Sequence, residues 1–288
     1  MESPSRAGFP GCVKNFLILG GSGKTGRRIA SRLTSAGHTV HTAGRTSGDV
    51  HLDLDDPDTH RSAFDGIDAA YLLEPSLDAG DRNPPRMAAL VDAAVAAGVS
   101  RLVLLSAPGA DSETHPLHTT EQAVRRSGLT WTVLRPGWFS QNFSEAFWLP
   151  SVRSGTLALP AGDRGVAFID AEDIADVAVA ALTEDRHAGQ VYELTGPRAL
   201  GFGEAAELIA AASGRPLRYV AVTPEAYQEQ QIANGVPPEA AARMADLVAR
   251  GSTGAFEGLT DGVEKALGRA PRRFEDFATA AAATGCWS

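Results

Sequence analysis

Three glycines spaced three residues apart, Gly20, Gly23 and Gly26, lie between an apolar run and a segment with helical periodicity. Lacking a Cβ, such positions let the backbone turn tightly and approach a phosphate group closely. The free N–H groups at the start of the following helix favour the negative charge of a pyrophosphate. The turn also contains three polar side chains, Ser22, Lys24 and Thr25. We therefore predict that residues 20–26 bind the phosphates of a dinucleotide on a Rossmann-type fold.

Two other interpretations of this turn are weaker. The run Gly23-Lys24-Thr25 is similar to the end of a nucleotide-triphosphate P-loop, which needs another glycine five residues before its second one. Ile18 occupies that place, inside the preceding apolar run, so the P-loop pattern fails. A glycine-rich connection between a strand and a helix, with no ligand, is the structural alternative.

The end of the second predicted strand indicates which dinucleotide binds. Enzymes that use NAD place Asp or Glu there, against the ribose hydroxyls. This chain has Arg45, Thr46 and Ser47 instead. Because a guanidinium matches the geometry of a phosphate, we predict that these residues bind the 2′-phosphate of NADP(H), with a solvated loop arginine as the alternative. Asp53 is a candidate partner of the adenine amino group, or simply part of the acidic turn 53–58.

Ser106 and His118 are the candidate catalytic residues. Ser106 follows a predicted strand at the edge where open α/β sheets bind ligands, so it could donate a hydrogen bond to substrate or cofactor. His118 stands near a predicted helix start, and histidine ionises close to neutral pH, so it could donate a proton. A serine that caps a loop and an exposed histidine are the structural alternatives. Leu73 and Pro136, near two other strand ends, complete the predicted cofactor contacts.

Aromatic residues gather just after the predicted strand 130–134, where the chain leaves the sheet. Aromatic faces stack on conjugated rings, and one amide can orient a polar atom among apolar walls. We therefore predict a flat small-molecule substrate, with an apolar contact between two lobes as the alternative. The residues in question are Trp138, Phe139, Asn142, Phe147 and Trp148.

All these residues must be positioned by the secondary structure, in which short apolar strands alternate with helices. This alternation is typical of a doubly wound parallel sheet, here with six βα repeats. Strands are predicted at 13–19, 38–43, 49–54, 69–73, 101–106, 130–134, 166–169 and 191–194. Helices are predicted at 24–36, 84–97 and 119–127, and from about residue 172. Asp170 and Asp173 are interpreted as helix caps. After residue 197 three or four helices are expected, two of them starting at Thr223-Pro224-Glu225 and Pro237-Pro238-Glu239.

The division into domains follows from this pattern: a flexible leader at 1–12, a Rossmann domain at 13–196, and a smaller, mostly helical substrate-covering region at 197–288. The net charge of -9 argues against a nucleic-acid partner. The two cysteines, Cys12 and Cys286, predict neither a disulfide framework nor a metal site. With no long apolar segment, we expect no membrane span, a cytoplasmic protein, and a monomer or homodimer.

Several longer motifs resemble the NmrA-like atypical short-chain dehydrogenases and reductases. They include Leu17–Gly26, Leu104–Ser106, Trp131–Phe139, Asn142-Phe143, Phe168–Ala175, Gly262–Lys265 and Pro271–Phe274. Within that family the chain looks most like the branch of the festuclavine and agroclavine dehydrogenases and their bacterial relatives. The resemblance implies NADPH as cofactor, a place in secondary metabolism, and hydride transfer to a C=N, C=C or quinone in a small cyclic molecule.

One departure from ordinary short-chain dehydrogenases concerns the proton donor. The chain has lysines only at 14, 24 and 265, and none follows a tyrosine by four residues. The usual Tyr-x-x-x-Lys mechanism is therefore excluded. A hydrolase is not supported either, because the G-x-S-x-G elbow is missing. Two function classes stay open: an NADPH-dependent reductase, and a cofactor-binding redox sensor that does not turn the dinucleotide over, as the resemblance also allows.

Overall fold

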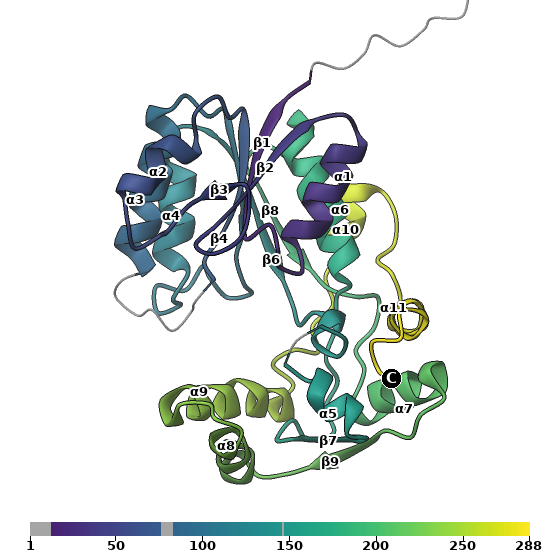
Figure 1. The fold of residues 1–288 in the computed structure, drawn as a ribbon. Helices are drawn as coiled ribbons and strands as arrows, with labels where there is room; N and C mark the ends of the chain where they lie inside the picture. Colours follow the sequence, from purple (N-terminus) through teal and green to yellow (C-terminus); the bar gives the residue numbers. More distant parts are fainter. Residues whose placement is uncertain (1–12, 76–82, 146) are drawn as a thin grey trace, which may run out of the picture.

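The computed structural model describes residues 13–75, 83–145 and 147–288, which form two packed bodies (Figure 1). The upper body holds a large sheet between two layers of helices, and the lower body holds a small sheet with helices around it. The predicted leader 1–12 lies outside the described residues. Within the described part of the chain, no helix is long and apolar enough to cross a membrane.

A seven-stranded parallel sheet forms the centre of the upper body, in the order β3-β2-β1-β4-β5-β6-β8. The chain therefore adds β2 and β3 outward from β1 and then returns to its other side with β4. Ligands of open α/β sheets bind where the strand order reverses in this way. The strands are β1 (Asn15–Leu19), β2 (Thr39–Gly44), β3 (Val50–His51), β4 (Ala69–Leu73), β5 (Arg101–Leu105), β6 (Thr130–Pro136) and β8 (Gln190–Leu194).

Helices cover both faces of this sheet (Figure 1), so the predicted doubly wound fold is confirmed. One layer comprises α1 (Gly26–Ser35), α6 (Ala171–Thr183) and α10 (Gly262–Leu267), and the other α2 (Asp58–Ala63), α3 (Asn83–Ala96) and α4 (His118–Arg126). Successive strand residues point to opposite faces. Phe16 and Ile18 thus enter the core beneath α1 and α6, whereas Leu17 and Leu19 enter the core on the other side.

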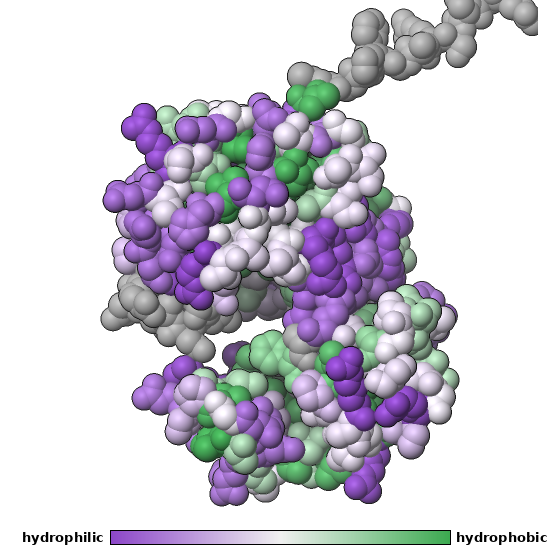
Figure 2. Space-filling model, viewed as in Figure 1, coloured by the Kyte–Doolittle hydropathy of each residue, from purple (hydrophilic) through white to green (hydrophobic). Residues whose placement is uncertain are grey.

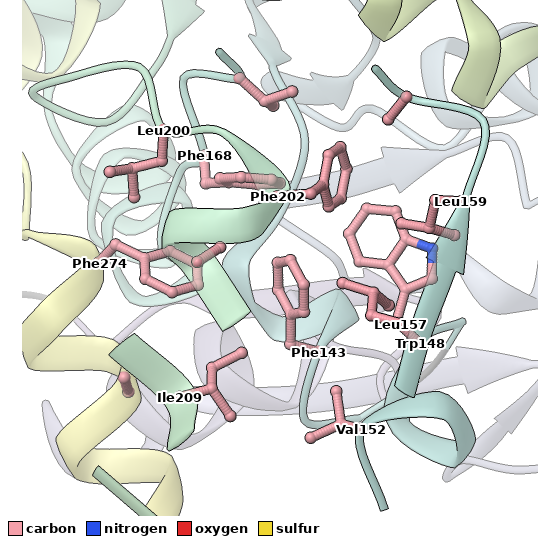
Figure 3. Close-up of a cluster of buried hydrophobic side chains, with 14 of the residues drawn as sticks. Phe143, Trp148, Val152, Leu157, Leu159, Phe168, Leu200, Phe202, Ile209 and Phe274 are labelled. Carbon is pink, nitrogen blue, oxygen red and sulfur yellow. The ribbon is translucent and has the colours of Figure 1, made fainter. Parts of the chain in front are cut away.

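The lower body has a two-stranded parallel sheet of β7 (Thr156–Leu159) and β9 (Arg218–Ala221). Its helices are α5 (Leu149–Arg153), α7 (Phe202–Ser213), α8 (Pro224–Ala233), α9 (Pro238–Ala249) and α11 (Phe274–Ala283). Three 3-10 helices, Ser140–Asn142, Asp185–His187 and Arg250–Thr253, complete the described elements. Aromatic rings fill the interior (Figure 3). The ring centre of Phe143, for example, lies 5.3 Å from that of Phe168 and 5.5 Å from that of Phe274, and both pairs are edge-to-face.

The predicted elements differ from the structure in three respects. The segment 166–169 forms no strand and makes only isolated bridges from Val166 to Leu200 and from Ile169 to Phe139, so the predicted strand is wrong. Its apolar residues reflect burial between the two bodies. The strands β7 and β9 were not predicted, and five α-helices, not three or four, follow residue 197 among the residues described.

The predicted end of the strand at residue 134 is also wrong, because β6 continues through Arg135 to Pro136, which pairs with Leu194. Proline lacks an N–H group and is tolerated only where no sheet hydrogen bond needs one. The ladder to β5 ends at Leu134, two residues earlier, so Pro136 has a partner strand on one side only.

The division of the packing between the two bodies does not follow the predicted boundary at residue 196. The lower core includes Phe143 and Trp148, and α10 packs back onto α6 in the upper body. The division 13–196 and 197–288 remains a prediction about independent domains, while the packing links segments from both ranges.

Asp170 caps α6 as predicted, because its carboxylate accepts from the Glu172 N–H at 2.8 Å. Asp173, predicted as a second cap, has another role. Its side chain is fully buried, accepts from the Arg272 N–H at 2.7 Å and lies 2.7 Å from the Arg269 guanidinium. It therefore ties the segment after α10 to α6.

Candidate cofactor and substrate site

The glycine turn lies at the carboxyl end of β1 and leads into α1, beside the point where the strand order reverses. A Cβ at Gly26 would stand 2.2 Å from the Gly20 carbonyl oxygen, so only glycine allows the helix to start so close to the strand. A Cβ at Gly23 would meet the same oxygen at 3.1 Å and otherwise project into open space among the described atoms. Gly26 thus serves packing, and Gly23 leaves the outer face of the turn accessible.

The N-terminus of α1 has the properties of an anion site. Among the described residues, no side chain caps it and its first turn carries no acidic residue. Exposed N–H groups at such a helix end carry partial positive charge and bind phosphate. Thr25 supports the turn from inside, because its hydroxyl accepts from the buried Tyr71 phenol at 2.9 Å. A pyrophosphate fits this cradle.

A cavity of about 380 Å³ opens beside the turn, at the ends of β1, β2 and β4. We call it the polar cavity because its lining contains four charged residues, Arg45, Asp53, Asp55 and Arg86. Its lining includes six of the predicted cofactor residues: Gly20, Arg45, Thr46, Ser47, Asp53 and Leu73. The Ser47 hydroxyl also lies 3.0 Å from that of Ser22 and thus connects this cavity to the glycine turn. The structure therefore brings together the residues predicted to hold the adenosine end of the dinucleotide.

Arg45 differs from the other arginine of this cavity. Arg86 forms an ion pair with Asp55 at 3.0 Å and another with Glu74. The guanidinium of Arg45 is exposed and has no ion-pair partner among the described residues. It is available to an anionic ligand. One carboxylate oxygen of Asp53 already accepts a hydrogen bond from the Asp55 N–H, at 3.0 Å.

A second, apolar cavity of about 360 Å³ lies where the upper body faces α8 and α9, and the surface is hollowed between the two bodies (Figure 2). Three predicted substrate residues line it: Trp138, Phe147 and Trp148. Trp138 stacks on Trp148 with ring centroids 5.2 Å apart. Trp148 is 2% exposed and belongs to the aromatic core, so it supports the wall more than it offers a free face.

The opposite wall of this cavity was missed from the sequence. It consists of side chains on α8 and α9, namely Tyr227, Ala240, Arg243, Met244, Leu247 and Val248. The two Pro-Glu helix starts predicted the helices correctly. Which helix faces would meet Trp138 depends on the packing of the lower body, which no local pattern reports. Pro75, after β4, lines both the polar and the apolar cavity.

Phe139 and Asn142, the other two predicted substrate residues, lie outside the described lining of the apolar cavity. Both instead contact Lys24. The Lys24 ammonium donates to Asn142 Oδ1 at 2.8 Å and lies 5.8 Å from the centre of the Phe139 ring. Lys24 therefore extends from the glycine turn to Asn142 and Phe139, whereas the sequence predicted that it borders the pyrophosphate or caps an exposed helix face.

Ser106 lies at the end of β5, as predicted, but its hydroxyl is already committed. It is buried and donates to Glu121 Oε1 at 2.6 Å. Burial raises the pKa of Glu121, but hydrogen bonds from Arg135 and Ser106 outweigh this and leave the pKa below its ordinary value. Glu121 is therefore a carboxylate, and Ser106 has only acceptor capacity left.

This buried network was not predicted as part of the site. Arg135 makes two hydrogen bonds of 2.8 Å to Glu121 and a third, of 3.0 Å, to Glu193 on the neighbouring strand. The sequence offered one signal, an arginine at the end of an otherwise apolar strand, because such a charge must find a partner when buried.

His118 begins α4 and is half-buried. Its Nδ1 lies 3.2 Å from the Ala110 carbonyl oxygen, so this ring nitrogen contacts its own loop. Neither His118 nor Pro136 lines the two cavities as the described residues define them. The predicted proton-donor role of His118 thus gains no geometric support.

Comparisons with known proteins agree with this geometry. Residues 20–185 match the family model described as NAD(P)H-binding. The NAD(P)H azoreductase of Xenophilus azovorans is 34% identical over 93% of this chain and 98% of its own. The agroclavine dehydrogenase of Claviceps fusiformis is 32% identical over 91% of this chain and 95% of its own. The crystal structure of an NADPH-dependent quinone oxidoreductase from Escherichia coli with NADPH has a TM-score of 0.74, at 24% identity, over 92% of this chain and 99% of that one.

Reductases and dehydrogenases thus align with this chain over nearly its whole length, and the chain is an NAD(P)H-dependent oxidoreductase. The chain belongs to the NAD(P)H-binding family, among the NmrA-like atypical short-chain dehydrogenases and reductases that its motifs predicted.

Proposed function

We propose that the chain is an NADPH-dependent reductase that transfers a hydride to a C=N, C=C or quinone group of a small, flat cyclic molecule. One observation carries the proposal: a polar cavity with an unpaired arginine and an apolar cavity with stacked tryptophans meet at Pro75. A dinucleotide that crosses the reversal point of the sheet extends from the first cavity toward the second. NADPH supplies a hydride when bound there.

Cofactor preference rests on Arg45. Residues 45–47, directly after β2, include no acidic residue, and the Arg45 guanidinium has no ion pair among the described residues, so the site favours the 2′-phosphate of NADPH over the bare ribose of NADH. Thr46 and Ser47 lie in the same lining and add hydroxyl donors.

The protein's contribution to chemistry is orientation more than acid catalysis. The hydroxyl proton of Ser106 is committed to Glu121, and no Tyr-x-x-x-Lys pair exists in the sequence. Acceptors that are already electrophilic suit such a site, because they need little protonation during hydride transfer. The rings of Trp138 and Phe147 would hold a flat acceptor and exclude water.

The test is the oxidation of NADPH, followed by its absorbance, with a panel of quinones, cyclic imines and enones. The same panel is run on the variant Trp138→Ala, which removes a wall of the apolar cavity and leaves the lining of the polar cavity unchanged. We expect turnover with at least one class and a loss of that turnover in the variant. If NADPH binds but no acceptor oxidises it, the result favours the alternative function, a redox sensor that binds the dinucleotide without turning it over. Different affinities for NADP⁺ and NADPH would then support that function.

A further inference from the structure

Among the described residues, Lys24 carries the only ammonium group that contacts a side chain of the apolar cavity's lining. It stands in the glycine turn. Its Nζ donates to Asn142 Oδ1 at 2.8 Å and lies 5.5 Å from the centre of the Phe147 ring, which lines the apolar cavity. The cation therefore lies against a wall residue of the cavity assigned to the acceptor.

The charge of Lys24 is not neutralised by a carboxylate in direct contact. Glu145, the nearest acidic influence, pairs with Arg27 at 2.5 Å and with Arg28 at 2.7 Å. Among the described residues, the direct contacts of the Lys24 ammonium are a neutral amide oxygen and two aromatic faces, while the charges of Glu145, Arg27 and Arg28 act on it without a described contact. Burial lowers the pKa of Lys24, and the charge of Glu145 opposes this. A half-buried cation with neutral partners attracts negative charge strongly.

We propose that Lys24 selects the acceptor by charge: it favours molecules that carry or gain negative charge, such as quinones with an acidic substituent, over permanently cationic iminium ions. The inference rests on the proposed function and narrows its substrate class. When the hydride of NADPH adds to a ring carbon conjugated to a quinone C=O, a C–H bond forms, the C=C and C=O π electrons shift onto that oxygen, and NADP⁺ remains. The enolate oxygen would face the ammonium and take a proton from water, and transfer of the ring C–H proton to the second oxygen then gives the aromatic hydroquinone. An iminium ion, by contrast, must approach a like charge.

The first test compares two acceptors in three variants. Lys24→Met removes the charge and keeps the length of the side chain, and Lys24→Arg keeps the charge. Lys265→Met removes an exposed lysine of α10 that pairs with Asp261, and serves as the control. A sulfonated naphthoquinone and a cyclic N-alkyl iminium ion are reduced with NADPH, and kcat/KM is measured for each.

For Lys24→Met we expect the preference for the sulfonated quinone over the iminium ion to fall about ten- to a hundredfold, since a hydrogen bond to a charged group is lost. Lys24→Arg should retain most of the preference, and Lys265→Met should leave it unchanged. An equal loss for both acceptors, together with weaker NADPH binding, would assign Lys24 to the pyrophosphate and overturn the proposal.

A binding measurement separates this inference from the proposed function. Naphthalene-2-sulfonate, which is not reduced, is titrated calorimetrically into the protein saturated with NADP⁺. We expect the affinity to fall about ten- to a hundredfold in Lys24→Met and to recover in Lys24→Arg. If no acceptor is ever reduced, the proposed function fails while this result still decides the role of Lys24. An unchanged affinity in Lys24→Met refutes it.

Discussion

Arg45 and the three turn glycines could be recognised from the sequence because their function depends on local chain geometry. A glycine fingerprint and the residue after the second strand lie within one βαβ unit, so short-range spacing determines where they stand. The links from Ser106 to Glu121 and from Lys24 to Asn142 join residues 15 and 118 positions apart. Such pairs depend on how the strands are ordered and how the bodies pack, and no local spacing encodes this.

Cofactor selection can be tested at Arg45 itself. Arg45→Ala should weaken NADPH binding about ten- to a hundredfold and leave NADH nearly unchanged, because only NADPH has the phosphate that the guanidinium meets. Fluorescence titration of both cofactors measures this. Arg61→Ala, which removes an exposed arginine of α2, is the control. Equal affinities for NADPH and NADH in the unmodified protein would count against the proposal.

The glycine turn allows binding to be separated from folding. Gly23→Val should abolish cofactor binding and leave the fold intact, since the new side chain projects outward from the turn. Gly26→Ala should instead lower the melting temperature, because its Cβ cannot stand 2.2 Å from the Gly20 oxygen. Circular dichroism and NADPH titration of both variants distinguish the two effects. A Gly23→Val protein with full affinity would show that the turn binds no phosphate.

If hydride transfer needs no proton donor from the protein, as proposed, the losses of activity at Ser106, His118 and Trp138 can be predicted. General acid catalysis is typically worth about 10²- to 10⁴-fold, so an essential donor cannot be removed cheaply. We expect Ser106→Ala and His118→Ala each to lose less than about tenfold in single-turnover NADPH oxidation, and Trp138→Ala to lose more. A thousandfold loss in His118→Ala, with disappearance of a pH step in the histidine range, would make His118 the proton donor.

At the scale of elements, the main βα units were predictable because the inner strands β1, β4 and β5 are nearly continuous apolar runs and the helices that follow them have a clear start or end signal. The Gly37 and Gly98 helix ends, for instance, agree with α1 and α3. The four-residue strands β7 and β9 gave no such signal, since their pairing joins residues about 60 positions apart. The apolar segment 166–169 resembled a strand because burial between two bodies produces the same composition.

Ion pairs between α1 and α6 predict a pH dependence of stability. Burial raises the pKa of Glu172, but hydrogen bonds from Arg32 and Arg28 outweigh it and lower the pKa below its ordinary value. A carboxylate with a depressed folded pKa stabilises the fold above its unfolded pKa, and this contribution disappears as the pH falls through the folded pKa. Glu172→Gln should therefore lower the melting temperature at neutral pH, and the difference from the parent protein should shrink once the pH falls below the ordinary glutamate pKa and vanish below the folded pKa.

Thermal unfolding at a series of pH values checks this expectation. Glu229→Gln, which alters an exposed carboxyl group of α8, should have no effect at any pH. A constant difference between Glu172→Gln and the parent across the whole range would mean that the side chain acts through packing and not through its charge.

At the scale of the whole molecule, the two cavities are lined by different parts of the chain. The polar cavity is lined by residues 19–86, and the apolar cavity by Pro75 and residues 138–248. Under the proposed function, the first third of the chain would hold the reductant, and side chains from the later part would enclose the molecule to be reduced. Only Pro75 belongs to both described linings.

This separation has an evolutionary consequence. Substitutions on α8 and α9 can reshape the wall of the apolar cavity without disturbing the grip on the dinucleotide, so one ancestral scaffold can acquire new acceptors while it keeps its electron source. The same property makes the helical pair a transplantable module. Replacing residues 224–249 with the corresponding helices of a homologue should reorder the preferred acceptors and leave the affinity for NADPH unchanged. A chimera that loses NADPH binding would reveal that the two halves are energetically inseparable.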